Sequence, residues 1–432
     1  MEDNIIKEVK KSRSYNQLYN LPLNLFFKEA QQGITFSTFV NILILNSTCN
    51  GFGDIVFAFK LKRYLEEWYG SSVNVKIATN NYNGFVSILR EQEKSDIIPL
   101  NLKGRYKNIQ CKKFNSFVQD PSLENFDLYL VAPITADYKP DFKEIHSLIK
   151  SSNRFNTAFL SEYNMPIYKD MLFNVGVGKK RDGLFLIEKP STPPPLIPKL
   201  DYPYSIIYIA ENDNSLENCY EGYLELLTSK IKIDRLDVVA PPWLRSYVEN
   251  DIPLDVVDEH YSVIRAIYKD NNKNIVEKNI IKDGNGKGEL VFRFDILPLK
   301  FDDMTSLYYY SLPIMLLTGD QSFSDGLSIR KDDSLIFYQG LPWKQDFYVN
   351  MAKEIPNKFF KSYKTACGNA KALKYKPNLT NFAKKNDFRT KAKRKMDALI
   401  MSVGYKSPFY TAFKETTLKS KNLKTLKKKL GL

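Results

Sequence analysis

The chain has 432 residues, of which 43% are hydrophobic and 13% aromatic, so it is long and apolar enough to bury more than one core. No stretch approaches the roughly 18 apolar residues of a membrane-spanning helix, and the start "MEDNIIKEVKKSRS" lacks the apolar centre of a secretory signal, so we expect a cytoplasmic protein. Two histidines and four widely separated cysteines argue against a metal site and against a disulfide framework, and we expect reduced thiols.

The net charge of +14 is concentrated in the C-terminal part of the chain. Residues 351–432, the basic extension, contain 22 Lys/Arg and 4 Asp/Glu, whereas residues 1–350 contain 41 and 45. Such a segment is typical of a surface for an anionic membrane, an acidic partner or nucleic acid, and it equally fits a solvated helical appendage. Its last part, "ETTLKSKNLKTLKKKLGL", predicts a basic amphipathic helix. Such a helix can lie on an anionic membrane, which would make the protein peripheral there, can dock on an acidic protein, or can pack its leucines back onto the first domain. Few aromatic residues near the end are suited to stacking on bases, so nucleic acid is the less favoured partner.

In chain order, a lead-in over residues 1–39 precedes the first pattern of alternating strands and helices. "NILILN" (41–46) has the length and apolarity of a buried strand, and a helix pattern follows it up to Gly70. Further strand patterns are "VNVKIAT" (73–79), "FDLYLVAP" (126–133) and "NTAFLSEY" (156–163). This alternation predicts a mostly parallel sheet, and we assign residues 40–187 to a first α/β domain.

A proline-rich segment, "EKPSTPPPLIPKLDYP" (188–203), predicts a stiff linker between domains. Beyond it the pattern restarts, with a strand over 204–212, a helix over 215–230 capped by Ser215, and a strand over 235–242. Residues 204–350 are therefore predicted to form a second α/β domain. The basic extension over 351–432 follows as a mainly helical appendage.

A glycine-containing loop, "NGFGD" (50–54), joins the first strand to its helix. Gly51 and Gly53 allow a sharp turn and leave space for a ligand beside the backbone, with Asn50 in the same loop. Asp54 is predicted at the helix N-terminus, where a carboxylate can take a proton from a nucleophile or simply cap the helix. Both interpretations of Asp54 stand at this point.

A second polar turn, "TGDQSFSDGLS" (318–328), follows the apolar run "IMLLT". Its candidate ligand-binding residues are Gly319, Asp320, Gln321 and Ser322. A helix that opens near Ser322 would present backbone N–H groups and a positive dipole end to a phosphate or diphosphate. The same residue types also form ordinary caps and turns. Lys344, further along, is a candidate for stabilising negative charge on a leaving group.

Taken together, these motifs resemble those of bacterial protein-arginine rhamnosyltransferases. "NGFGDIVFAFKLKRYL" is similar to that family's Asp-Asn-Phe-Gly-Asp-Ile-Gly motif and following helix. "TGDQSFSDGLS" is similar to its Arg-Gly-Glu-Asp-Ser-Phe motif, and "IFYQG" to its Ile-Tyr-Pro-Gln. The chain departs from the pattern at Asn50, Val56, Asp320 and Gln321, so the resemblance concerns fold and reaction class rather than sugar or acceptor.

The resemblance implies a GT-B glycosyltransferase, with two Rossmann-like domains facing across a cleft. It implies an inverting reaction without a metal, and a nucleotide-sugar co-substrate instead of a cofactor, held mainly by the second domain. Asp54 then corresponds to the catalytic carboxylate, Asp320 to the glutamate on the diphosphate side, and Ser322 to the serine that contacts the diphosphate. The acceptor in that family is a protein.

Two alternatives lie in other classes. A non-catalytic binding protein with a degenerate GT-B fold would use the basic extension for nucleic acid or an anionic membrane, but its expected sign is loss of the carboxylate in the first loop, and Asp54 is present. A metal-dependent GT-A transferase would need an Asp-X-Asp at a strand end, which we do not find. A glycosyltransferase is therefore the predicted function.

Overall fold

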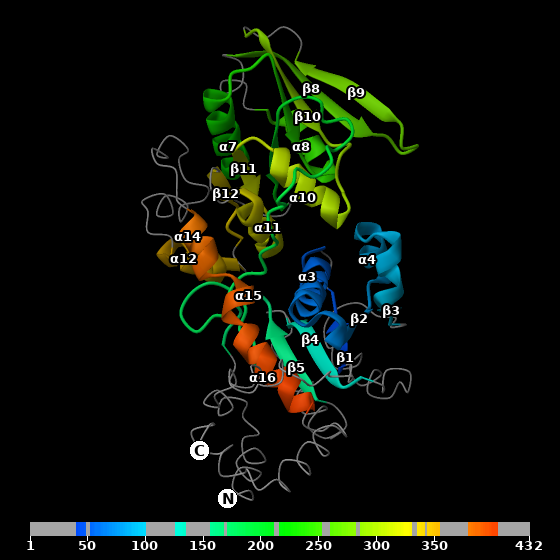
Figure 1. The fold of residues 1–432 in the computed structure, drawn as a ribbon. Helices are drawn as coiled ribbons and strands as arrows, with labels where there is room; N and C mark the ends of the chain where they lie inside the picture. Colours follow the sequence, from blue (N-terminus) through cyan, green and yellow to red (C-terminus); the bar gives the residue numbers. More distant parts are fainter. Residues whose placement is uncertain are drawn as a thin grey trace, which may run out of the picture. The chain divides into compact units, whose positions relative to one another are not determined.

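The computed structural model describes residues 40–48, 52–100, 126–134, 156–167, 171–210, 216–252, 260–281, 286–330, 335–341, 344–354 and 379–404 (Figure 1). Asn50, Gly51 and Ser215 lie outside these ranges, as does the predicted amphipathic helix at the C-terminus. Within the described ranges the chain forms two compact units. The first holds residues up to Tyr82, from Ser95 to Val175 and from Phe388 onward, and the second holds Asn83–Lys94 and Gly176–Asp387.

The first unit is built on a five-stranded parallel sheet. Its strands in spatial order are β3 (Ile97–Pro99), β2 (Val73–Thr79), β1 (Val40–Asn46), β4 (Leu128–Ile134) and β5 (Thr157–Ser161). The first strand of the chain is central, and successive strands add first on one side and then on the other, which is the Rossmann order. β1 and β4 are apolar throughout their centres because both faces of a parallel sheet are covered.

Helices on the first unit come from distant parts of the sequence. α3 (Phe52–Tyr69) follows β1 directly and packs on β1, β2 and β4, with Ile55, Ala58 and Leu65 buried. α15 (Phe388–Lys391) and α16 (Lys393–Gly404) also belong to this unit. The buried ring of Phe388 stacks on Tyr64 of α3 with centroids 6.1 Å apart. The part of the basic extension from Phe388 to Gly404 therefore belongs to the first folded unit.

The second unit contains a seven-stranded sheet. Its order is β12 (Leu335–Tyr338), β11 (Ile314–Leu317), β6 (Tyr204–Tyr208), β7 (Arg235–Val239), β10 (Gly288–Arg293), β8 (Tyr261–Lys269) and β9 (Ile275–Ile281). All neighbouring strands are parallel except β8 and β9. When the β8–β9 hairpin is set aside, the other five strands repeat the Rossmann order of the first unit. The predicted α/β class with two Rossmann-like sheets is confirmed.

Most helices of the second unit connect these strands, and two follow the last strand. They are α7 (Leu216–Lys230), α8 (Arg245–Asn250), α10 (Phe301–Tyr310), α11 (Asp320–Arg330), α12 (Gln345–Glu354) and α14 (Leu379–Lys385). α4 (Tyr82–Ile88) is grouped with this unit for most of its length. Cys219 of α7 is disulfide-bonded, which corrects the expectation that all four cysteines are reduced. No helix within the described ranges is long and apolar enough to cross a membrane.

The proline-rich segment is bound to the second unit. Directly before the segment, the Ile187 N–H donates to Ser328 Oγ at 3.0 Å, and within it the carbonyl oxygen of Pro194 accepts from the Tyr310 hydroxyl at 2.7 Å. Arg293 donates to the carbonyl oxygen of Lys199. The compact units divide at Val175/Gly176 and at Asp387/Phe388, whereas the sequence-based boundaries are 187/188, 203/204 and 350/351.

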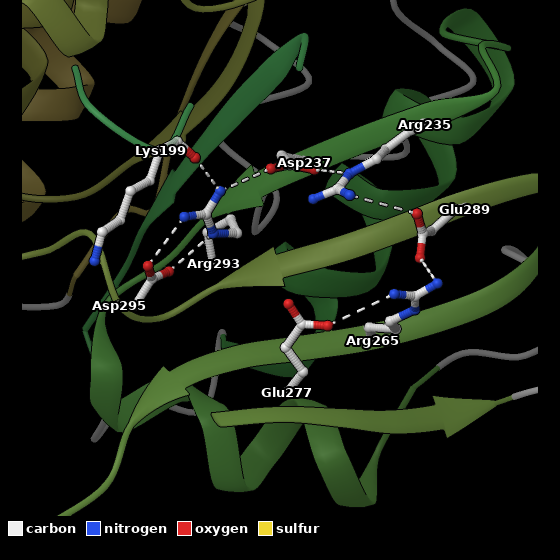
Figure 2. A network of polar contacts seen from close by, with 8 residues as sticks. All are labelled: Lys199, Arg235, Asp237, Arg265, Glu277, Glu289, Arg293 and Asp295. Carbon is white, nitrogen blue, oxygen red and sulfur yellow. Dashed lines mark hydrogen bonds and ion pairs between the residues drawn. The ribbon is translucent and has the colours of Figure 1, made fainter. Parts of the chain in front are cut away.

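A network of charged side chains extends over β7, β10, β8 and β9, from a buried centre at Arg293 and Asp237 to the more exposed Arg265 and Glu277 (Figure 2). Arg293 binds both carboxylate oxygens of Asp295, at 2.8 and 2.9 Å, and one oxygen of Asp237 at 3.0 Å. Arg235 pairs with the other Asp237 oxygen at 2.9 Å, and Arg265 pairs with Glu289 at 2.6 Å. Burial lowers the pKa of Arg293, but the paired carboxylates outweigh it, so this pKa lies above its ordinary value. Each arginine of the network is thus paired with at least one carboxylate.

Candidate functional site

The topology of the first sheet points to a ligand-binding edge. The chain adds β2 and β3 on one side of β1, and β4 and β5 on the other. The order therefore reverses between β1 and β4, and ligands of open α/β sheets bind beyond the carboxyl ends of the strands at such a switch point. Asn46 ends β1, and Ile134 ends β4.

Asp54 lies at this edge, in the first turn of α3 and half-buried. The two helix residues before it, Phe52 and Gly53, are exposed. A Cβ added at Gly53 would meet no atom within 4 Å, so there is open space beside the backbone just ahead of the carboxylate. The carboxylate also benefits from the positive end of the helix dipole.

Two amide side chains form hydrogen bonds near this edge, one of them to the start of α3, and sequence reasoning missed both. The fully buried Asn46 side chain donates to the main-chain oxygens of Asp54 and Ala132, each at 3.0 Å. Thr79 Oγ1 donates to Asn46 Oδ1 at 3.2 Å. Asn80 Oδ1 accepts from the Thr48 N–H at 2.8 Å. The signal available beforehand was a polar residue that closes an apolar strand, in "NILILN".

The second sheet has its switch point between β6 and β11. β7 lies on one side of β6, whereas β11 and β12 lie on the other. The predicted turn comes directly after β11: Gly319 has a φ of +76°, a conformation that favours glycine, and α11 begins at Asp320. The helix thus starts two residues before Ser322, where the sequence placed it, because an aspartate is favourable in a first helical turn.

Asp320 is engaged inside the unit. Its side chain is 4% exposed; Lys344 Nζ lies 2.8 Å from Oδ2, and the Tyr338 hydroxyl donates to Oδ1 at 3.3 Å. Two of the residues chosen from sequence, Asp320 and Lys344, are therefore an ion pair. The carboxylate fixes the lysine, whose side chain remains 14% exposed.

The other two residues of the turn differ in burial. Gln321 is buried, and Ser322 is half-buried. Ser322 forms a hydrogen bond with the phenol of Tyr308; burial and the charge of Asp325 raise the pKa of that phenol, and the Ser322 bond lowers it in part. The Ser322 hydroxyl thus has a protein partner as well as a position at the helix start.

Gln339 directly follows β12 and forms hydrogen bonds with residues that follow β6 and β11, at the same switch point. The Ala210 N–H donates to Gln339 Oε1 at 2.7 Å, and the Gln339 side-chain amide donates back to the carbonyl oxygen of Ala210 at 3.4 Å. Thr318 Oγ1 donates to the Gln339 carbonyl oxygen at 3.3 Å. This glutamine belongs to "IFYQG". Its side-chain amide is fully buried and holds Ala210, which follows β6, next to the end of β12.

A cavity of about 430 Å³ opens near the carboxyl ends of β8 and β10, on the hairpin side of the same sheet. Arg245, whose guanidinium lies 3.9 Å from the centre of the Tyr268 ring, lines it together with Lys269 and Phe294. Two strands, β6 and β7, lie between β10 and β11 in the sheet, so the cavity is distinct from the turn at Gly319. Within the described ranges, no group of three or more His, Cys, Asp or Glu side chains is arranged to hold a metal ion.

No protein-family model matches the sequence, and curated proteins give no match either. Among solved structures, the glycosyl transferase family 9 protein of Veillonella parvula is 10% identical with a TM-score of 0.37, covering 71% of this chain and 83% of that one. The MnaA protein of S. aureus in complex with UDP is 11% identical with a TM-score of 0.38, covering 77% and 92%. The glycotransferase of kitacinnamycin is 9% identical with a TM-score of 0.41, covering 85% and 98%. At such identities and TM-scores these similarities do not decide what the chain binds.

Proposed function

We propose that this protein is a glycosyltransferase that moves a sugar from a nucleotide-sugar donor to an acceptor by an inverting, metal-independent reaction. The observation that carries the proposal is the location of the two motifs. Each motif, one from each half of the chain, lies at the switch point of a separate Rossmann-like sheet, with Asp54 on one and Gly319 to Ser322 on the other. A protein acceptor is the case that the family resemblance suggests.

In this proposal the second unit holds the donor diphosphate. The α11 N-terminus and the Lys344 ammonium supply positive charge at one edge, and the diphosphate gains negative charge as it leaves. Asp320 does not touch the phosphate, because its carboxylate is buried and would repel it. Its role is to hold Lys344 in place, with Tyr338 as a second partner.

The first unit provides the base. The acceptor nucleophile forms a bond to the anomeric carbon while the bond from that carbon to the diphosphate oxygen breaks. The electron pair leaves with the nucleoside diphosphate, and the proton of the nucleophile passes to the Asp54 carboxylate. Attack from the face opposite the leaving group gives inversion.

Nucleotide recognition is the direct test of this function. Thermal unfolding is measured with UDP, GDP, dTDP and their sugars, because a ligand that binds only the folded state adds about 2.7 kcal/mol of apparent stability at 100 times its Kd. We expect one nucleoside diphosphate and its sugar to raise the Tm. No shift with any member of the panel would contradict the proposal.

Metal independence is tested separately. Release of nucleoside diphosphate from the donor, with water in place of the acceptor, is expected to continue unchanged in EDTA. The charge-stabilising groups in the proposal are Lys344 and the helix terminus, and neither requires an ion. Strict dependence on Mg²⁺ or Mn²⁺ would instead favour the metal-dependent GT-A class.

The basic extension is proposed to bind an acidic or anionic partner and to make a cytoplasmic protein peripheral at a membrane. Its described helices, α14 to α16, span 379–404 and carry seven Lys/Arg against two Asp/Glu. The alternative function, a binding protein without catalysis, would keep this charge but show no donor turnover. Turnover and its loss in Asp54→Asn therefore separate the two functions.

A further inference from the structure

Asn46 makes three hydrogen bonds from a fully buried position at the end of β1. Its Nδ2 donates to the main-chain oxygens of Asp54 and Ala132, and its Oδ1 accepts from Thr79 Oγ1. Two carbonyl acceptors on one side require an NH₂ group there, so the orientation of the amide is defined. Thr79 Oγ1 in turn accepts from the Asn81 N–H at 3.1 Å, which directs its own hydrogen toward Asn46.

The three bonds link three separate segments. They connect the end of β1 to the first turn of α3, to β4 across the switch point, and to the end of β2. The carbonyl carbon of Asp54 is bonded to the same Cα that carries the Asp54 side chain. A shift of the Asn46 amide is therefore transmitted directly to the carboxylate.

Packing alone does not favour an amide side chain at the buried end of β1. The preceding residues of β1, Ile42 to Leu45, are apolar and buried, and an apolar residue would extend that core. A buried polar group instead has to be fully hydrogen-bonded to avoid a desolvation penalty. The three hydrogen bonds of Asn46 fix the position of the first turn of α3 relative to β1 and β4. A leucine at this position would form no such directional contacts.

We propose that Asn46 is a positioning residue that holds Asp54 at the first switch point, in the orientation in which its carboxylate meets the attacking nucleophile. This rests on the proposed function, because the benefit is the position of a catalytic base. Asn46 touches neither donor nor acceptor in this role.

The test compares Asn46→Ala with Asn80→Ala. Asn80 is a matched control, since it is an amide at the same edge that bonds Thr48, through its N–H at 2.8 Å and its carbonyl oxygen at 3.3 Å, and not Asp54. Donor hydrolysis is measured with the nucleotide sugar that raises the Tm. A displacement of about 1 Å in a catalytic group costs on the order of 100-fold, so kcat is expected to fall by that factor in Asn46→Ala. The donor KM of Asn46→Ala should stay within about threefold of the wild-type value. The kcat of Asn80→Ala should also stay within about threefold of the wild-type kcat.

A second readout does not depend on activity. The Ala58 amide has the Asp54 carbonyl as its helical acceptor, so its hydrogen exchange reports on this turn. Exchange should accelerate in Asn46→Ala and not in Asn80→Ala. If the wild type hydrolyses no nucleotide sugar, the proposed function fails, and Ala58 exchange alone decides whether Asn46 fixes the turn.

Two outcomes would overturn the inference: unchanged kcat in a folded Asn46→Ala, or equal losses in both variants. If Asn46→Ala does not fold, Thr79→Val provides the test, since it keeps the side-chain shape and removes the bond to Asn46 Oδ1 together with the acceptor of the Asn81 N–H. Thr79→Val should lower kcat without changing donor KM. An unchanged kcat in that variant would contradict the inference.

Discussion

Two ion-paired clusters in the second unit differ in size and in their position on the sheet. Arg293 is 5% exposed and is surrounded by Asp237, Asp295 and the carbonyl oxygen of Lys199 (Figure 2). Lys344 is 14% exposed and pairs with Asp320 where the strand order reverses. The first cluster holds strands and linker together, while the second lies at the edge where we propose that the donor diphosphate binds. Buried charge alone is thus a weak sign of function, and its position on the sheet separates the two roles.

The largest effect is expected from breaking the first cluster. Arg293→Met leaves Asp237 and Asp295 buried without their shared partner, and breaking a buried pair on one side costs about 3–5 kcal/mol. Urea unfolding of this variant should show that loss, while the folded fraction still binds nucleoside diphosphate. Glu277→Gln is the control: its side chain is 58% exposed, so the cost should stay below about 0.5 kcal/mol. Equal costs for both variants would contradict a fold-holding role for Arg293.

Breaking the second cluster should affect binding as well as stability. Lys344→Met is expected to weaken nucleoside diphosphate binding by about 2 kcal/mol or more, since a charge-assisted contact is lost. It also leaves the Asp320 carboxylate buried and unpaired. Adding Asp320→Asn to Lys344→Met removes that penalty, so the double variant should regain stability without regaining affinity. Recovery of affinity together with stability would show that Lys344 acts only through the fold.

A smaller effect is expected at Ser322. Ser322→Ala removes one hydroxyl at the start of α11 and keeps the backbone N–H groups and the helix dipole, so diphosphate affinity should fall by about 1 kcal/mol. The nucleoside alone should bind as before, which isothermal titration of nucleoside and nucleoside diphosphate can compare. Equal losses for both ligands would locate the phosphate site elsewhere.

Sequence alone predicted two α/β domains and the strands that end at both switch points, because the relevant signals are local. It did not predict β3, β8, β9 or β10. The runs over residues 42–45 and 314–317 are apolar throughout, as strands buried on both faces must be. Gly319 was recognisable because a turn with positive φ favours glycine, and the structure has that conformation there. The residues directly after such strands were therefore identifiable as candidate ligand contacts before any fold was known.

The contacts that decide each residue's role were not predictable. Asn46 reaches Ala132 across 86 positions, Lys344 reaches Asp320 across 24, and Ile187 reaches Ser328 across 141. Each contact depends on strand order or on the path of the linker, which no local pattern encodes. The prolines of 188–203 indicated an extended segment, but its hydrogen bonds bind it to the second unit.

Substitution of the proposed base tests the central claim most directly. Asp54→Asn keeps the side-chain shape and removes the basic oxygen, so donor hydrolysis should slow by roughly 100-fold or more, the contribution of a general base. Its Tm and its Kd for nucleoside diphosphate should match those of the wild type, because the diphosphate is proposed to bind the second unit. Wild-type turnover by Asp54→Asn would contradict the assignment of Asp54 as the catalytic carboxylate.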